Sequence, residues 1–365
     1  MKYLLVILSF SFIGIDFLWA QKSSSRKAND PSEEYLFPGT GFFIKDRKPY
    51  EDYQAKAWFK QAYLLEKEDK ASKALSFYEK FTKRRSDATL EIDSKTYKVA
   101  PESLFRAAKI REQKGDWSKS FDNLKLIAQA YTDYKFELVA DYLMRISERL
   151  ANEKLPSKWG IIPRFSSGSQ DRSRFNEISS LTKGPKHAPR ALMVLAEISI
   201  KDNKEEEAVD ALTRLVNLYP DHYLCEKAYF LIAQVYEKMV SGPAYDQGAT
   251  MKSLNFYEDY LILYENAPSR DIHESKEKYD SRIKDYALRK KNAEQGRIRM
   301  RESLALSKLE IGSYLENYGK YFITRWRDLG NEPSLQFYNE AITVAPESEA
   351  ARIAEKKILN LKNGE

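Results

Sequence analysis

The stretch PRALMVLAEISIKDNKEEEAVDALTRLVNLYP, residues 189–220, decides the fold. Its apolar residues recur at helical intervals, so it predicts a pair of amphipathic helices. Large Leu192 is followed four residues later by small Ala196, and twelve residues further on small Ala208 is followed by Leu212. Small side chains at these positions let the two helices of a pair cross closely, and the large ones fill the gaps beside them.

The same order of small and large residues recurs along the chain. One copy lies at residues 55–87 and another at 101–132, and two later copies carry long insertions between their helices. The copies consist of Trp58, Ala62, Ala74, Tyr78 and Phe81; Leu104, Ala108, Ser120, Leu124 and Ile127; Tyr229, Ala233, Ser253, Tyr257 and Tyr260; and Gly312, Ser334, Tyr338 and Ala341. Residues 136–152 and 174–181 read as a degenerate pair, and residues 347–361 as a closing helix.

This periodicity predicts an all-α, tetratricopeptide-type α-solenoid. We expect a right-handed superhelix of about six helix pairs, with a C-terminal helix that caps the array by its polar face.

The composition excludes several classes of protein. Hydrophobic residues make up 42% of the 365 residues and charged residues 31%, which is unlike a polytopic membrane protein. The net charge of +6 is spread too evenly to indicate nucleic acid as a partner. A single cysteine, Cys225, excludes an internal disulfide and a cysteine-based zinc site.

The N-terminus predicts export. Lys2 precedes an apolar run, and small Ala20 stands before Gln21, so residues 1–20 read as a signal peptide, with an uncleaved membrane anchor as the alternative. Residues 21–49 contain few apolar side chains and predict a flexible linker. The helical repeats begin at residue 50, and we divide them into N-terminal repeats at 50–186 and C-terminal repeats at 187–365, because a family resemblance begins at residue 187.

The second half, residues 187–362, resembles the BamD family of tetratricopeptide proteins. The resemblance rests on the repeat at Leu192 to Pro220 and on three further motifs. These are Tyr245-Asp246-Gln247 before Ser253-Leu254-x-x-Tyr257, Leu304-Ala305-x-x-Lys308-x-Glu310-Ile311-Gly312-x-Tyr314, and Pro346-x-Ser348-x-Ala350-Ala351. Residues 53–132 show the same type of repeat with fewer specific matches.

The resemblance implies a non-catalytic periplasmic scaffold that binds proteins or peptides during outer-membrane β-barrel assembly. Its implied partners are a β-barrel assembly subunit or unfolded outer-membrane protein segments, and it implies peripheral association with the outer membrane. BamD proteins are lipoproteins attached through a cysteine at the cleavage site, where this chain has Gln21. Tetratricopeptide coordinators of Tol-Pal or cell-wall processes share the resemblance and form the alternative.

Catalytic and cofactor-binding patterns are missing from the sequence. The three histidines, His187, His222 and His273, show no metal-binding spacing, and no glycine-rich phosphate loop occurs. Cys225 fits a small buried apolar residue better than an activated thiol. We therefore predict no enzyme, no cofactor and no metal; a hydrolase on a helical scaffold would need a nucleophile and base that the sequence does not show.

Two candidate binding surfaces remain. The first is a peptide groove on the first helices of the pairs, lined by Phe59, Tyr63, Phe105, Lys109, Met193, Glu197, Phe230 and Gln234. The alternative is that its four apolar residues at equivalent positions, Phe59, Phe105, Met193 and Phe230, pack between adjacent repeats. The second is a basic stretch facing a partner or anionic lipid, or else a solvated helix face, and it comprises Arg289, Lys290, Lys291, Arg297, Arg299 and Arg301.

Overall fold

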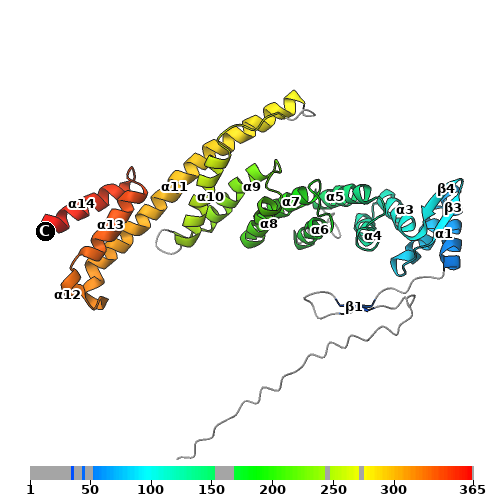
Figure 1. The fold of residues 1–365 in the computed structure, drawn as a ribbon, viewed down its shortest axis with the longest axis horizontal. Coiled ribbons are helices and arrows are strands. Elements are labelled where there is room, and N and C mark those ends of the chain that lie inside the picture. The colour runs from blue at the N-terminus through cyan, green and yellow to red at the C-terminus, as the bar shows by residue number, and fades with distance from the viewer. Residues whose placement is uncertain are drawn as a thin grey trace, which may run out of the picture. The chain divides into compact units, whose positions relative to one another are not determined.

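The computed structural model describes residues 34–36, 43–45, 52–152, 168–242, 247–270 and 275–363. The chain divides into two compact units, residues 1–110 and 111–365, and each is described by itself (Figure 1). The predicted signal peptide lies outside the described residues. None of the helices within those ranges has the length and apolar character that crossing a membrane requires. The predicted division at residues 186 and 187 rests on resemblance and stays a prediction.

The first unit contains two short hairpins besides its helices. Strands β1 (Glu34–Leu36) and β2 (Phe43–Lys45) pair antiparallel within the predicted linker. Helices α1 (Asp52–Lys67) and α2 (Ala71–Tyr78) pack together, and a 3-10 turn, Glu79–Thr82, follows α2. Strands β3 (Thr89–Ile92) and β4 (Lys95–Lys98) form the second hairpin, which leads into α3 (Val99–Gln113).

The β3–β4 hairpin turns through two residues in the left-handed region. Asp93 has φ of 52° and Ser94 has φ of 59°, which is the geometry of a type I′ turn. This turn matches the twist of the two strands, so the chain reverses within two residues. The sequence reasoning did not identify this hairpin.

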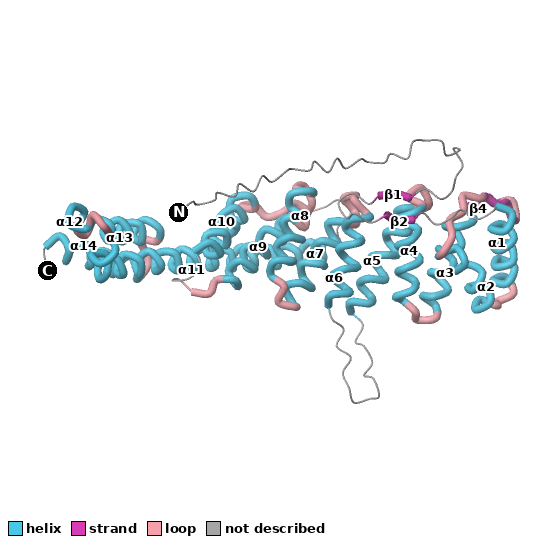
Figure 2. The backbone as a smooth tube through the Cα atoms, turned by 90° about the horizontal axis from the view of Figure 1, so that it is seen from below, coloured by secondary structure: helices cyan, strands magenta, loops and turns pink. Residues whose placement is uncertain are grey.

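From α4 to α11, the second unit is a succession of helices in which each helix packs against the next one in the chain (Figure 2). Its first seven helices are α4 (Trp117–Ala130), α5 (Phe136–Asn152), α6 (Gly168–Leu181), α7 (Ala188–Lys201), α8 (Glu205–Leu218), α9 (Cys225–Met239) and α10 (Gln247–Leu263). The bounds of α5 agree with the helix predicted at 136–152.

The last part of this unit is built on one long helix. Helix α11 (Lys276–Phe322) has 47 residues and is followed by α12 (Trp326–Leu329), α13 (Glu332–Val344) and α14 (Glu349–Asn363). Met300 and Leu304 on α11 belong to the core cluster that includes Tyr257 of α10. Ala305 and Leu309 belong to the next cluster, with Tyr338 of α13. One helix therefore serves two successive helix pairs.

The small residues predicted at the helix crossings are all buried. They are Ala62, Ala74, Ala108, Ser120, Ala196, Ala208, Ala233, Ser253, Gly312 and Ser334. At Gly312 a Cβ atom would lie 2.7 Å from the ring of Tyr338, so the close crossing there requires glycine. The described chain is thus an all-α solenoid of tetratricopeptide type, as the spacing of small and large residues predicts.

Candidate protein-binding surface

The predicted groove is only partly accessible. Its four apolar side chains at equivalent positions are buried and so do not line an accessible surface; they are Phe59, Phe105, Met193 and Phe230. Phe230, for example, packs against Tyr257 and Tyr260 of α10, with ring centroids 6.3 and 5.7 Å away. Aromatic contacts at these distances are typical of a core.

Of the other four groove positions, one is buried and three are exposed. In the first unit, Tyr63 is buried beneath the β3–β4 hairpin, because the ring of Tyr97 lies 6.0 Å from it and its hydroxyl donates to Asp93 at 3.1 Å. Lys109, Glu197 and Gln234 are exposed. Glu197 accepts an ion pair from Lys227 on the next first helix at 2.6 Å. A binding role for the eight residues stays a prediction, and these three exposed residues are the accessible part of it.

Most cations of the predicted basic stretch bind other parts of the solenoid. Arg289 binds Glu226 through Nε at 2.9 Å and Nη2 at 2.7 Å. Three more bind elsewhere: Lys290 donates to the carbonyl of Glu265 at 2.7 Å, Arg299 to Glu237 at 2.7 Å, and Arg301 to the carbonyl of Val344 at 2.9 Å. The remaining two differ, since Lys291 is exposed, whereas Arg297 has a buried Nε without a hydrogen-bond partner. Much of this stretch therefore has a structural role, and a partner-facing or lipid-facing role stays a prediction.

A tyrosine–carboxylate–cation cluster links successive helix pairs. In the first unit, the Tyr78 hydroxyl donates to Glu66 at 2.6 Å, and Arg106 of α3 donates to the same carboxylate at 2.8 Å. In the second unit, Tyr257 and Arg299 share Glu237 of α9, and Tyr338 and Lys357 share Glu316 of α11. A further cluster at the start of α9 joins Tyr260 and Arg289 through Glu226.

The tyrosines of these clusters, Tyr78, Tyr257, Tyr260 and Tyr338, are fully buried. Burial first, and then the hydrogen bond to the Glu237 carboxylate, raises the pKa of the Tyr257 hydroxyl. Burial and the bond to Glu226 raise the pKa of Tyr260 in the same way. The hydroxyls therefore stay protonated and donate to the carboxylates, which excludes them as proton acceptors near neutral pH.

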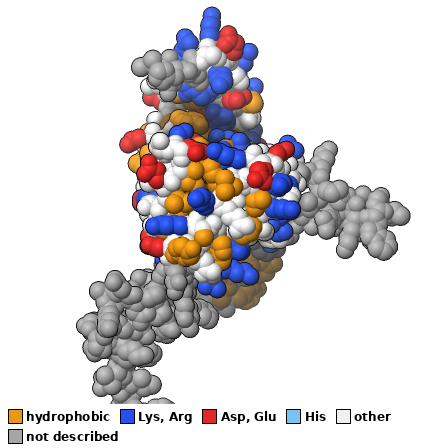
Figure 3. Space-filling model, turned by 90° about the vertical axis from the view of Figure 1, so that its right-hand side faces the viewer, with side chains coloured by type: hydrophobic (Ala, Val, Ile, Leu, Met, Phe, Trp, Pro, Cys, Tyr) orange, Lys and Arg blue, Asp and Glu red, His pale blue; other side chains and the backbone are white. Residues whose placement is uncertain are grey.

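One face of the molecule combines apolar and basic side chains. On the side of α1 and the β3–β4 hairpin, hydrophobic side chains lie among many Lys and Arg side chains (Figure 3). Tyr53 and Leu64 of α1 are exposed. Apolar surface surrounded by charge is typical of a protein-interaction surface.

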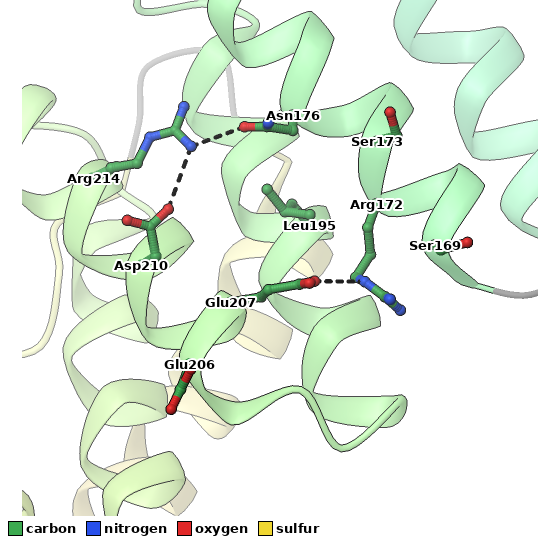
Figure 4. A pocket seen from close by; sticks show the side chains of 9 residues that line it. All are labelled: Ser169, Arg172, Ser173, Asn176, Leu195, Glu206, Glu207, Asp210 and Arg214. Carbon is green, nitrogen blue, oxygen red and sulfur yellow. Dashed lines mark hydrogen bonds and ion pairs between the residues drawn. The ribbon is translucent and has the colours of Figure 1, made fainter.

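A polar cleft of about 570 Å³ lies between α6, α7 and α8 (Figure 4). Leu195 of α7 is the apolar residue of its lining. Arg172 of α6 binds Glu207 at 2.6 Å, and Arg214 of α8 binds Asn176 at 2.9 Å and Asp210 at 3.5 Å. The rest of the lining is Ser169, Ser173 and Glu206. Since both arginines already bind carboxylates, the cleft suits hydrogen-bonding peptide groups better than an anion.

A second cleft, of about 560 Å³, lies between the start of α9, the end of α10 and the start of α11. Its lining includes His222, Tyr264 and Tyr286. Burial lowers the pKa of His222, whose Nδ1 accepts from the backbone N–H of Leu224 at 3.2 Å. Aromatic walls with mixed charges fit a peptide segment. Sequence reasoning missed both clefts, because their residues come from helices that are adjacent in space and carry no motif.

Among the described residues, His187, His222 and Cys225 show no arrangement for catalysis. Cys225 is buried, its thiol donates to the carbonyl of Tyr219 at 3.0 Å, and burial raises its pKa. It is therefore the small buried residue that the sequence favours. His187 is buried beside Glu137 of α5 at 3.3 Å, and His273 lies outside the described residues. Within the described ranges, no three His, Cys, Asp or Glu side chains gather as they would around a metal ion.

These features define a class: a helical-repeat protein with clefts and exposed side chains on its first helices, and proteins of this class typically bind other proteins. The tetratricopeptide repeat family model matches residues 190–222, which cover most of α7 and all of α8.

The most informative sequence relative is the outer membrane protein assembly factor BamD of Rickettsia prowazekii (strain Madrid E). The two are 30% identical over 92 residues, which is 25% of this chain and 37% of that protein. The chain therefore matches well under half the length of this relative. Among solved structures, the MamA protein matches with 14% identity and a TM-score of 0.28, over 67% of this chain and 91% of that one.

Proposed function

We propose that this chain is a non-catalytic protein-binding scaffold of the cell envelope that serves in the assembly of outer-membrane β-barrel proteins. The observation that carries the proposal is the 92-residue stretch at 30% identity to an outer membrane protein assembly factor. The tetratricopeptide fold supports the binding part of the proposal, since stacked helix pairs form extended surfaces for protein segments.

The geometry of the described residues supports binding rather than catalysis. The buried Cys225 thiol has a raised pKa, and the arginines of the cleft between α6 and α8 already bind carboxylates. By contrast, Lys109, Glu197 and Gln234 occupy equivalent exposed positions on three first helices. Repetition of one accessible position along a solenoid suits an extended or helical client.

The proposed location is the periplasm, with peripheral association at the outer membrane through a partner. The proposed partners are a β-barrel assembly subunit or unfolded outer-membrane protein segments. The basis for export is the apolar N-terminal run that ends at Ala20.

Affinity purification of the full-length tagged chain from envelope extracts in mild detergent tests this proposal. We expect quantitative mass spectrometry to show enrichment of a β-barrel assembly subunit with polypeptide-transport domains. Enrichment of Tol components or peptidoglycan synthases would favour the alternative coordinator role. Recovery of neither group would count against an assembly scaffold.

Matched variants make the same experiment specific to the surface. Lys109→Ala combined with Gln234→Ala removes two exposed inner side chains, whereas Lys119→Ala combined with Asn217→Ala removes exposed side chains of α4 and α8. We expect only the first pair to reduce partner recovery, by about fivefold for each kcal/mol of lost binding free energy. Circular dichroism should show the same helix content in both.

A further inference from the structure

Helix α11 carries an apolar seam along one side. Met300, Leu304, Ser307, Ile311, Tyr314 and Tyr318 follow one another at alternating intervals of four and three residues. This is the spacing of residues that face a partner helix. The seam therefore predicts that a helix lies along α11 throughout.

The first half of the seam is covered by α10. Met300 and Leu304 are buried in a cluster with Tyr257 and Leu254. Ser307 is buried as well, and its Oγ accepts from the side-chain amide of Gln247 at 2.7 Å. Gln247 is the first residue of α10, so the covering helix begins at this point.

Beyond Ser307 the same side of α11 is exposed and aromatic. Tyr314, Tyr318, Tyr321 and Phe322 are 56%, 52%, 75% and 53% exposed. Their rings contact one another, with centroids 5.2 Å apart for Tyr314 and Tyr318 and 5.8 Å apart for Tyr314 and Phe322. The seam thus continues past the helix that covers it.

We propose that this exposed aromatic seam, residues 311–322, binds the same seam of a second copy of the chain in antiparallel orientation. The seam is continuous with an interface that a helix already covers, so its occupant is a helix with the same spacing. A second copy supplies one, and a two-fold axis near Tyr318 brings the four rings of each copy together.

The charges at the two ends of the seam favour the antiparallel orientation. Glu310 is exposed beside the seam at its N-terminal end, and Arg325, which also binds Asp328 at 3.4 Å, is exposed just beyond its C-terminal end. Antiparallel pairing about Tyr318 brings Glu310 of one copy close to Arg325 of the other. Parallel pairing would bring like charges together, which is unfavourable.

The small area of the exposed rings indicates a weak, concentration-dependent dimer. An aromatic side chain buries about 150–250 Å², so four half-exposed rings offer roughly 400 Å² per copy. Two copies would bury roughly 800 Å² of ring surface, which with flanking side chains approaches the ~1,000 Å² of a small specific interface. We therefore expect dissociation in the micromolar range.

Sedimentation-velocity ultracentrifugation of the chain without its predicted signal peptide, residues 21–365, over a wide concentration range tests the proposal. We expect reversible dimerisation that Tyr318→Lys weakens at least tenfold, because it places two like charges at the two-fold axis. Ile262→Lys, at an exposed apolar position of α10, is the matched control and should dimerise like the unchanged chain. Equal helix content in both variants shows that Tyr318→Lys remains folded.

Exchanging the charges at the two ends of the seam distinguishes dimerisation through this seam from association through another surface. Glu310→Arg should weaken the dimer, and combining it with Arg325→Glu should restore it. A chain that stays monomeric at all concentrations, or a dimer that Tyr318→Lys leaves unchanged, overturns the proposal. So does a monomer whose binding to phosphatidylglycerol vesicles depends on Tyr318, since that result assigns the seam to a lipid surface.

Discussion

The α7/α8 pair and the α9–α11 region solve the same packing problem with different chemistry. At one repeat position, α8 has Leu212, which is fully buried, and α10 has Tyr257, whose hydroxyl donates to Glu237. The residue twelve before Leu212 is Ile200, so the α7/α8 pair has no carboxylate there. An apolar seam needs only the right volume, whereas a buried polar cluster is favourable only when every partner is in place.

The polar solution also reaches further along the chain. Its carboxylate comes from the first helix of a pair, its tyrosine from the second, and its cation from a later helix. Arg299 of α11 completes the cluster of α9 and α10, and Lys357 of α14 completes the cluster of α11 and α13. The hydrogen bonds of the cluster are directional, so they fix the position of one pair against the next. The apolar contacts of Leu212 have no preferred direction and do not fix that position.

The largest expected effect comes from removing a shared carboxylate. Glu226→Ala leaves Arg289 and Tyr260 without their partner, so we expect the free energy of unfolding to fall by about 3 kcal/mol. Glu197→Ala is the matched change on α7, where the ion pair with Lys227 is largely exposed, and it should cost less than about 1 kcal/mol. Urea unfolding followed by circular dichroism measures both, and equal losses would contradict the difference between the regions.

A smaller loss is expected from filling a close approach in the polar region. At Gly296 of α11 a Cβ atom would lie 2.4 Å from the ring of Tyr257, so Gly296→Ala should displace the ring and cost about 2 kcal/mol. Gly184→Ala is the control, because nothing lies within 4 Å of the added atom there. Hydrogen exchange should show faster opening of α10 and α11 in Gly296→Ala only. Unchanged protection of these helices would mean that the Tyr257 cluster does not define the crossing.

The smallest effect is a difference in alkaline stability. Because burial and Glu237 raise the pKa of Tyr257, the folded chain keeps a proton that an unfolded tyrosine loses above pH about 10. The free energy of unfolding therefore falls as pH rises past 10. Tyr257→Phe should lower the free energy of unfolding by about 1 kcal/mol at pH 8 and should reduce its further decrease above pH 10. Tyr236→Phe on α9 should leave that decrease unchanged. Thermal melts at pH 8 and pH 11 compare the two; an identical fall in both variants would contradict the shift.

The sequence predicts the helix pairs well, because the small residues at the crossings depend on spacing alone. Ala196 and Ala208 are buried where expected, and the helix at 136–152 has the predicted bounds. The continuous helix α11 was not predicted. The two core clusters along α11 meet near Leu304, and no proline interrupts the helix there. The local sequence therefore does not mark where one helix pair ends and the next begins.

The binding residues are harder to predict than the fold. Phe59 and Tyr63 lie beneath a hairpin that a repeat pattern does not contain, and Arg289 and Arg299 bind carboxylates 63 and 62 residues earlier in the chain. A basic run looks exposed when only its neighbours in sequence are considered. The available signal was the nearly constant separation from Glu226 to Arg289 and from Glu237 to Arg299, which matches two contacts about three helical turns apart on both α9 and α11.

The continuity of α11 has a mechanical consequence. Where two helices are joined by a loop, a pull on one is absorbed by the loop; the last two pairs of this chain share one rod of roughly 70 Å instead. Bending that rod sharply would break its backbone hydrogen bonds. A load on α13 and α14 therefore reaches α9 and α10 as a tilt of the whole helix, and the two core clusters along it stay a set distance apart.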